Sequence, residues 1–247
     1  MLNIQDSIIS VITPAHNEEK FLSKCIESVK ASADNVSADV EHIVVLNRCT
    51  DRTEEIATEA GCRIVREDAR VLSTIRNAGA AAAQGDIIVT IDADSWMTPN
   101  MLPEVIRMLE TGKYIGGGVR VQPERFSLGI LCTFLVILPF CARHGVFSAG
   151  LFWCYKKDFD AIGGFDDSLI CVEDVDFAKR LRLHGKTTGK KYGTIRKAKM
   201  LTSCRKFDEF GDWYFVRNPK VVYDVFKQNK AAANKIYYDF QNSLPRD

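Results

Sequence analysis

The sequence lacks the cysteine spacing that marks a zinc site. Its eight cysteines include no C-x-x-C pair, and several of them fall within apolar patterns. This argues against structural zinc and against the disulfide framework of a small secreted protein. The N-terminus, MLNIQDSIIS, has no basic segment followed by an apolar one, so no secretory signal is indicated. These features predict a cytoplasmic protein.

An excess of charge of either sign is also missing. The 33 lysines and arginines balance 32 aspartates and glutamates, which gives a formal net charge of +1. Domains that bind nucleic acid usually carry a strongly basic surface, so no nucleic-acid partner is expected. Any site for an anion must therefore be local.

The chain contains one conspicuous apolar run, and it is short. The segment LGILCTFLVILPFCA, residues 128–142, is apolar throughout and is interrupted by Pro139. A helix needs roughly 20 apolar residues to span a bilayer, so we predict that this segment is a buried core element. Peripheral membrane contact through 128–142 is the alternative, and membrane association would then follow.

Two glycine-rich signatures are absent. The first predicted strand is followed by TPAHNEE where a dinucleotide-dependent dehydrogenase would have G-x-G-x-x-G. No glycine-rich basic loop of the kind that holds a triphosphate occurs near the N-terminus, which counts against a nucleotidyltransferase.

The first half of the chain alternates between short β-branched runs and segments with apolar residues at helical spacing. The predicted strands are 7–13, 42–46, 63–65 and 87–91, and the predicted helices lie around 21–29, 56–60, 73–83 and 105–109. Repeated β-α units predict an α/β fold with a parallel sheet and helices on both faces.

The alternation breaks down after residue 113. The patterns predict strands at 114–121, 146–155 and 199–202, and a helix over 173–186 closed by Gly185. An aromatic-rich amphipathic tail follows.

Two aspartates stand one residue apart at the end of a buried strand. Because residues i and i+2 of an extended chain point to the same side, Asp92 and Asp94 could aim at a common point. Carboxylates together with substrate phosphate oxygens commonly hold Mg²⁺ or Mn²⁺. Alternatively, Asp92 starts a turn and Asp94 caps a helix, which requires no ligand.

Polar residues gather after two further strands, at 14–18 and 47–51. Ligands of open α/β sheets bind outside the carboxyl ends of the strands, so these segments belong to the candidate site.

Six motifs occur in an order that resembles family 2 glycosyltransferases of the GT-A fold. They are SVITPAHNEE (10–19), TDRT (50–53), RNAGAAAAQGD (76–86), DAD (92–94), GGFD (163–166) and ED (173–174). The resemblance covers about residues 7–205. It implies a GT-A fold with a Rossmann-like, mostly parallel central sheet flanked by helices and an irregular second half on the acceptor side.

The resemblance also implies a single glycosyltransferase domain over 1–247. Within it, 1–112 would bind the nucleotide sugar, 113–205 would form the acceptor and catalytic half, and 206–247 would be a helical tail. The activity implied is inverting transfer of a sugar from a nucleoside-diphosphate sugar to a sugar, lipid-linked or other hydroxyl acceptor.

Individual roles follow from the same resemblance. Asp94 would be the main ligand of Mn²⁺ or Mg²⁺, with Asp92 beside it, and Asp174 would be the catalytic base, with Glu173 as the alternate. The residues that would contact the nucleotide sugar are Pro14, His16, Asn17, Glu18, Asn47, Asp51, Arg76 and Asp92.

The chain departs from the family pattern after the second strand. Two acidic residues usually stand there, whereas this chain has Leu46 and Asn47. An amide both donates and accepts hydrogen bonds, so recognition of the base would differ; uridine is favoured and guanosine stays open.

Structural roles remain as alternatives. Glu173 and Asp174 could serve only as acids at a helix N-terminus, Asp51 could be only a helix cap, and Arg76 could be an exposed helix residue. Arg205 and Lys206 could meet donor phosphates or a lipid phosphate, but solvated surface charge is the favoured interpretation. A non-catalytic sugar-nucleotide-binding or scaffold protein that keeps the fold is the alternative function.

Overall fold

The computed structural model describes residues 7–144, 150–169, 172–227 and 229 of the chain, with side chains described up to 139 in the first range. Eight strands form one sheet in the order β3-β2-β1-β4-β7-β6-β8-β5. The strands are β1 Ile8–Ala15, β2 Asp39–Leu46, β3 Arg63–Arg66, β4 Ile87–Thr90, β5 Ser95–Met97, β6 Tyr114–Pro123, β7 Phe152–Tyr155 and β8 Lys191–Thr202. The helices are α1 Leu22–Ala33, α2 Thr53–Glu59, α3 Leu72–Ala82, α4 Met101–Glu110, α5 Leu128–His144, α6 Lys156–Ala161, α7 Glu173–Thr187, α8 Arg205–Phe210, α9 Tyr214–Arg217 and α10 Pro219–Phe226.

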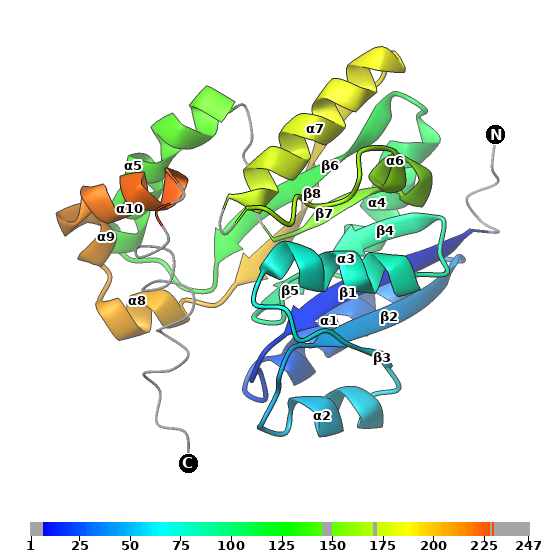
Figure 1. Cartoon of the computed structure of the whole chain (residues 1–247), viewed down its shortest axis with the longest axis horizontal. Helices are drawn as coiled ribbons and strands as arrows, with labels where there is room; N and C mark the ends of the chain where they lie inside the picture. The colour runs from blue at the N-terminus through cyan, green and yellow to red at the C-terminus, as the bar shows by residue number, and fades with distance from the viewer. Residues whose placement is uncertain (1–6, 145–149, 170–171, 228, 230–247) are drawn as a thin grey trace.

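The first half of the sheet is parallel. β1 pairs with β2 on one side and β4 on the other, and β3 adds to β2 in the same direction. β7 then joins β4 and β6 as an antiparallel strand, and β8 runs parallel to β6. The predicted α/β fold with a mostly parallel sheet flanked by helices is confirmed (Figure 1).

Both faces of the central strands are buried, which explains their continuous apolar runs. On β1, Ile9 and Val11 belong to the core cluster that includes Val105 of α4, whereas Ile12 belongs to a second cluster, on the other face, that includes Phe177 of α7. The sheet therefore lies between two helical layers, as Figure 1 shows.

Several elements differ from the sequence-based predictions. β8 begins at Lys191, well before the predicted start at 199. The prediction missed its first residues because they alternate between buried and exposed positions and include several charges. α7 continues past Gly185 to Thr187: a Cβ at Gly185 would lie 2.8 Å from Ile115 Cγ2, so this glycine serves close packing and does not end the helix. β5 was not predicted. Part of the predicted strand 146–155 lies outside the described residues.

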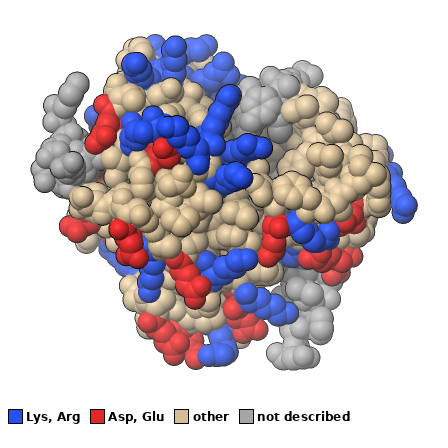
Figure 2. All heavy atoms as spheres, turned by 180° about the vertical axis from the view of Figure 1, so that it is seen from behind, with Lys and Arg blue, Asp and Glu red and all other residues tan. Residues whose placement is uncertain are grey.

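The prediction that 128–142 is a buried core element is wrong. One face of α5 packs against α9 and α10, but the other is exposed. The exposed large apolar side chains there are Leu128, Leu131, Phe134, Leu135 and Leu138, with Phe126 just before the helix. Figure 2 shows a broad uncharged expanse on the side of the molecule that carries these helices. Among the described residues, no helix is both long and apolar enough to cross a membrane.

Candidate active site

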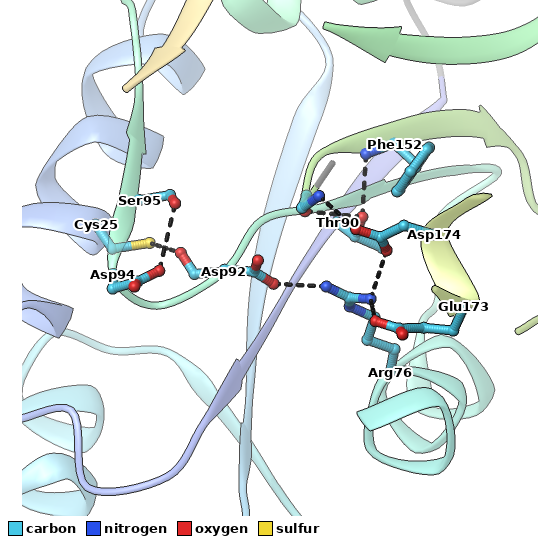
Figure 3. A network of polar contacts seen from close by, with 10 residues as sticks. Cys25, Arg76, Thr90, Asp92, Asp94, Ser95, Phe152, Glu173 and Asp174 are labelled. Carbon is cyan, nitrogen blue, oxygen red and sulfur yellow. Dashed lines mark hydrogen bonds and ion pairs between the residues drawn. The ribbon is translucent and has the colours of Figure 1, made fainter. Parts of the chain in front are cut away.

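The candidate site lies where β1 and β4 end and where α7 begins. Arg76 comes from α3, Asp92 and Asp94 follow β4, and Glu173 and Asp174 open α7. Residues far apart in the sequence thus meet at one edge of the sheet, and Figure 3 shows Arg76 between Asp92 and the two acids of α7.

Arg76 is the centre of this arrangement. Its side chain is 1% exposed, and its Nη2 donates to Asp92 Oδ1 at 2.7 Å. Its Nη1 donates to Asp174 Oδ1 at 2.7 Å and to Glu173 Oε1 at 3.0 Å. The alternative of an exposed helix residue is therefore wrong. A rigid guanidinium fork fixes all three carboxylates relative to one another.

Burial and mutual repulsion act against the ionised carboxylates. Burial and the charge of the neighbouring Asp174 raise the pKa of Glu173 to about 7, although the positive charge of Arg76 acts to lower it. Burial also raises the pKa of Asp92. Burial lowers the pKa of Arg76, but the three carboxylates more than reverse this and keep the guanidinium charged.

Gly150 closes the cluster from the other side. Its N–H donates to Asp174 Oδ2 at 2.9 Å, so both oxygens of that carboxylate are held. Gly150 has a φ of +75°, and a Cβ there would lie 2.7 Å from Asp92 Oδ2. Both the backbone conformation and the space require glycine. The sequence placed Gly150 only within the segment FSAGLF, residues 147–152, which the family resemblance implies on the acceptor side and which close strand packing would also explain.

The GGFD turn is tied to α3 by the residue next to Arg76. Asn77 Oδ1 accepts from the Phe165 N–H at 2.9 Å, and its Nδ2 donates to the Phe165 carbonyl at 2.8 Å. The Arg76 Cζ lies 5.1 Å from the centre of the Phe165 ring. One helix therefore positions both the arginine and the loop that leads into α7.

Asp94 belongs to a second ion-pair group. Arg205, the first residue of α8, donates from Nη1 to Glu18 Oε1 at 2.9 Å and to Oε2 at 2.8 Å. Its Nε lies 3.0 Å from Asp94 Oδ2, which also accepts from Ser203 Oγ at 3.0 Å. Burial is the main reason that the pKa of Glu18 is raised to about 7, and the charge of Asp94 adds to it.

The interpretation of Arg205 as solvated surface charge is wrong. Its position directly after β8 was the available signal, because the end of β8 lies beside β5 and the Asp94 turn. Burial and the charge of Arg205 lower the pKa of neighbouring Lys206 to about 8, so that lysine is not a simple solvated charge either.

Asp92 and Asp94 do not aim at a common point. The chain turns between them, with the Ser95 N–H donating to the Asp92 carbonyl at 3.0 Å, so the extended geometry assumed from the sequence is wrong. Asp92 contacts Arg76 and Asp94 contacts Arg205, as shown for Asp92 in Figure 3.

The remaining predicted donor-site residues bind the loops together. Asp51 Oδ1 accepts from the Thr53 N–H at 3.0 Å, so Asp51 holds the first residue of α2 from just before the cap position, which is Arg52. Asn17 has a φ of 54°, and its Oδ1 accepts from the Thr50 N–H at 2.8 Å. Pro14 lies within β1.

Asn47 is buried, and its amide is used internally. Nδ2 donates to the carbonyls of Glu67 at 2.6 Å and Ala69 at 2.7 Å, while Oδ1 accepts from Arg48. The His16 Nδ1 contacts the Asn47 carbonyl. These contacts give Asn47 a structural role at the end of β2, and a role toward a nucleobase stays a prediction.

The charges and ligand types of the site suit a divalent cation. The carboxylates of Glu18, Asp92, Asp94, Glu173 and Asp174 outnumber the two arginines that contact them. In the described part of the chain, no three His, Cys, Asp or Glu side chains are arranged to hold a metal on their own. The residues therefore fit a hard cation whose remaining ligands come from substrate oxygens.

Similar proteins of known sequence and structure were found. A relative is the undecaprenyl-phosphate 4-deoxy-4-formamido-L-arabinose transferase of Edwardsiella ictaluri, 28% identical over 122 residues, or 45% of this chain and 37% of that protein. Another is a low-salt glycan biosynthesis hexosyltransferase of Haloferax volcanii, 34% identical over 104 residues, or 42% of this chain and 25% of that protein. The matches thus span well under half the length of these relatives.

Two solved structures share the fold. The mannosyltransferase of Pyrobaculum calidifontis in complex with GDP-Man and Mn²⁺ has a TM-score of 0.67 at 16% identity, covering 93% of this chain and 65% of that one. Glucosyl-3-phosphoglycerate synthase of Mycobacterium tuberculosis with Mn²⁺, UDP-glucose and phosphoglyceric acid has a TM-score of 0.60 at 22% identity, covering 89% and 79%.

The family model described as glycosyl transferase family 2 matches residues 10–164, more than half of the chain. That segment holds Arg76, Asp92 and Asp94, and the acids of α7 follow it. This chain belongs to glycosyl transferase family 2.

Proposed function

We propose that this protein transfers a sugar from a nucleoside-diphosphate sugar to an acceptor hydroxyl, with inversion and with the help of Mn²⁺ or Mg²⁺. The observation that carries the proposal is the contact of one buried arginine, Arg76, with Asp92 on the donor side and with Glu173 and Asp174 on the acceptor side. Together with membership of the family, this supports a site in which donor and acceptor groups meet.

Asp94 would hold the cation, with Asp92 near it. When bound, the cation would supply Lewis-acid stabilisation of the charge on the departing nucleoside diphosphate. The buried Glu18 and Arg76 would exclude water from this edge, and they would orient the donor together with the partly exposed Arg205.

Asp174 would accept the proton of the acceptor hydroxyl. Arg76 and the Gly150 N–H hold its two oxygens, which fixes the direction of the carboxylate. A base must lie within about 2.6–3.2 Å of the proton donor, and a fixed carboxylate meets this more readily than a mobile one. Glu173 is the alternate base. A single displacement from the face opposite the leaving group inverts the anomeric carbon.

The acceptor is proposed to reach the site from a lipid surface. α5 exposes Leu131 and Leu135, at 53% and 61%, and residues 128–144 contain no aspartate or glutamate. Such a helix suits the interfacial region of a bilayer. Relatives named as undecaprenyl-phosphate transferases support this choice. Peripheral membrane association would follow.

The test is a binding and turnover assay. Purified protein is titrated with UDP- and GDP-sugars with and without Mn²⁺, beside Asp94→Ala. Metal-dependent binding of one class of donor, with UDP favoured, and its loss in Asp94→Ala are expected. Asp34→Ala, at the C-terminal end of α1 and far from the site in sequence and contacts, is the control.

If no nucleotide sugar binds under either condition, the transferase proposal is wrong. If donors bind but neither hydrolysis nor transfer occurs with any acceptor, the alternative of a non-catalytic sugar-nucleotide-binding protein is supported.

A further inference from the structure

Arg205 is held between two carboxylates from different elements. Glu18 follows β1 and Asp94 follows β4, and both lie within ion-pair distance of the Arg205 guanidinium. We infer that Arg205 is a displaceable counter-ion of the cation site: it neutralises Asp94 until a divalent cation binds there, and then turns on Glu18 to contact the donor diphosphate. This inference rests on the proposed function.

The two contacts of Arg205 are unequal. Nη1 donates to both oxygens of Glu18, whose side chain is 6% exposed, at 2.9 and 2.8 Å. Nε is 3.0 Å from Asp94 Oδ2, but this pair lacks hydrogen-bond geometry, and Nε has no other hydrogen-bond partner within the described residues. The contact with Glu18 is therefore the stronger one. A rotation of the guanidinium can break the Asp94 contact first while Glu18 remains bound.

Arg205 also keeps hydrogen-bonding capacity for a ligand. Its Nη2 makes no hydrogen bond with any residue that the structure describes, and its side chain is 23% exposed. A guanidinium binds phosphate oxygens with two donors in a fixed fork. Nη2 and the displaced Nε are the two donors that would meet the diphosphate.

α8, the element that carries Arg205, has six residues, none of them buried. It is held through Phe207, which packs edge-on against Phe215, and through Asp208, which pairs with Arg125. Ser203 holds Asp94 by side chain and backbone: its N–H donates to the Asp94 carbonyl at 2.9 Å. Asp94 is thus fixed from β8, whereas the guanidinium two residues later is held by Glu18 and by the Phe21 ring, whose centre lies 5.6 Å from Arg205 Cζ.

A counter-ion at this place has a physical reason. Asp94, Asp92 and Glu18 lie close enough to affect one another electrostatically, and like charges in a partly buried site repel. Arg205 offsets this repulsion before ligands bind. Once a divalent cation neutralises Asp94, contact with the negative diphosphate stabilises the guanidinium more than contact with Asp94 does.

The experiment separates the two halves of the inference. Binding of Mn²⁺ alone is measured from the electron paramagnetic resonance signal of the free ion, for wild type and Arg205→Gln. Binding of UDP and GDP at saturating Mn²⁺ is then measured by calorimetry. Arg205→Gln removes a competing ion pair, so Mn²⁺ alone should bind roughly fivefold more tightly. The nucleoside diphosphate should bind about tenfold more weakly, because a charged donor to phosphate is lost.

Arg107→Gln is the matched control. Arg107 also contacts a carboxylate, that of Glu104 on the same helix α4, and neither residue belongs to the site. It should change neither affinity. Arg205→Lys keeps the charge without the fork and should give intermediate values; it serves as the deciding variant if Arg205→Gln does not fold, as judged by thermal unfolding.

The outcomes distinguish this inference from the proposed function. If wild type binds neither Mn²⁺ nor a nucleoside diphosphate, the proposed function itself is wrong. If wild type binds both and Arg205→Gln binds Mn²⁺ equally or more weakly, the counter-ion role is overturned. If Mn²⁺ binds more tightly but the diphosphate affinity is unchanged, the contact with the diphosphate is overturned.

Discussion

Arg76 Nη1 lies 2.7 Å from Asp174 Oδ1 and 3.0 Å from Glu173 Oε1, although 97 or more residues of chain separate the arginine from these acids. The contact joins the helix after β3 to the helix after the GGFD turn. Its energy depends on burial: removing one partner leaves a charge unpaired in a site that excludes water.

Replacing Arg76 is expected to destabilise the fold as well as the site. Arg76→Ala should lower the free energy of unfolding by about 3–5 kcal/mol, because three carboxylates lose their common partner. Urea unfolding followed by circular dichroism measures this. Arg107→Ala, which removes an exposed arginine paired with Glu104 on α4, should cost roughly 0–1 kcal/mol. Equal costs for the two variants would contradict the central role of Arg76.

Asp174→Asn should separate chemistry from binding. The amide keeps the shape and the acceptor for Arg76 but cannot take a proton, so turnover should fall about 10²–10⁴-fold while donor affinity stays near wild type. Initial rates and donor titrations provide the measurement. Glu173→Gln should reduce turnover less. A larger loss of turnover in Glu173→Gln would mean that Glu173 is the catalytic base and Asp174 is not.

Gly150→Ala tests the close approach of the backbone to Asp92. The added Cβ would meet Asp92 Oδ2 at 2.7 Å, and the residue would keep a φ of +75°. We expect a cost of about 1–3 kcal/mol for the strained backbone, together with a lower turnover from displacement of Asp92. Unfolding curves and rates are compared with those of the control below.

Gly163→Ala is the matched control for this change. Gly163 has a φ of +76°, and within the described part of the chain its Cβ would meet nothing within 4 Å. Gly163→Ala should lower the free energy of unfolding by the backbone cost alone and should leave turnover unchanged. Equal loss of turnover in both variants would show that the contact with Asp92 is unimportant.

His42 should make stability depend on pH. Burial, and then the charge of Lys30, lowers the pKa of His42 from its ordinary value of 6.5 to about 4. Its Nδ1 is enclosed without a hydrogen-bond partner among the described residues, so the folded state prefers the neutral ring. The unfolded chain binds the proton first as the pH falls. The contribution of His42 is therefore present above pH 6.5 and is lost progressively between pH 6.5 and 4, by up to about 3 kcal/mol.

The measurement is urea unfolding of wild type and His42→Gln across this range. Other groups titrate in both proteins, so the difference between the two curves isolates His42. The wild-type advantage should shrink as the pH falls. Parallel curves would show that His42 is protonated equally in the folded and unfolded states.

The exposed face of α5 predicts binding to lipid. Leu131→Gln with Leu135→Gln should reduce co-sedimentation with anionic lipid vesicles at least several-fold, because two fully inserted leucines are worth roughly 1.5–3 kcal/mol each. Leu183→Gln changes a leucine of α7 that is similarly exposed, at 50%, and should have no effect. If wild type does not sediment with vesicles, the lipid-surface proposal fails while the transferase proposal stands.

The sequence predicted the first half of the fold well because local periodicity and burial agree there. β1, β2 and β4 are apolar on both faces, so short β-branched runs identified them. β8 was truncated because charges interrupt its alternation. α5 was assigned to the core because composition alone cannot show which apolar face lacks a partner.

The candidate site was predictable only where motifs exist. Arg76, Asp92 and Asp174 were chosen through family motifs, and the structure brings them into contact. The contacts of Arg205 and Gly150 were not predicted, because they are long-range contacts that no local pattern records. The geometry of Asp92 and Asp94 was misjudged because the chain turns between them, whereas the prediction that residues i and i+2 point to the same side holds only for an extended chain.

The position of Arg76 and Asn77 side by side on α3 has a consequence for how the protein unfolds. Apart from Asp92, their partners named above, Glu173, Asp174 and Phe165, come from beyond residue 164, and β7 completes the pairing of β4. A fragment ending near residue 112 would keep the buried guanidinium but lose two of its carboxylates and a neighbouring strand. We therefore expect the donor-side and acceptor-side halves to melt in a single transition and to resist division into separately stable pieces.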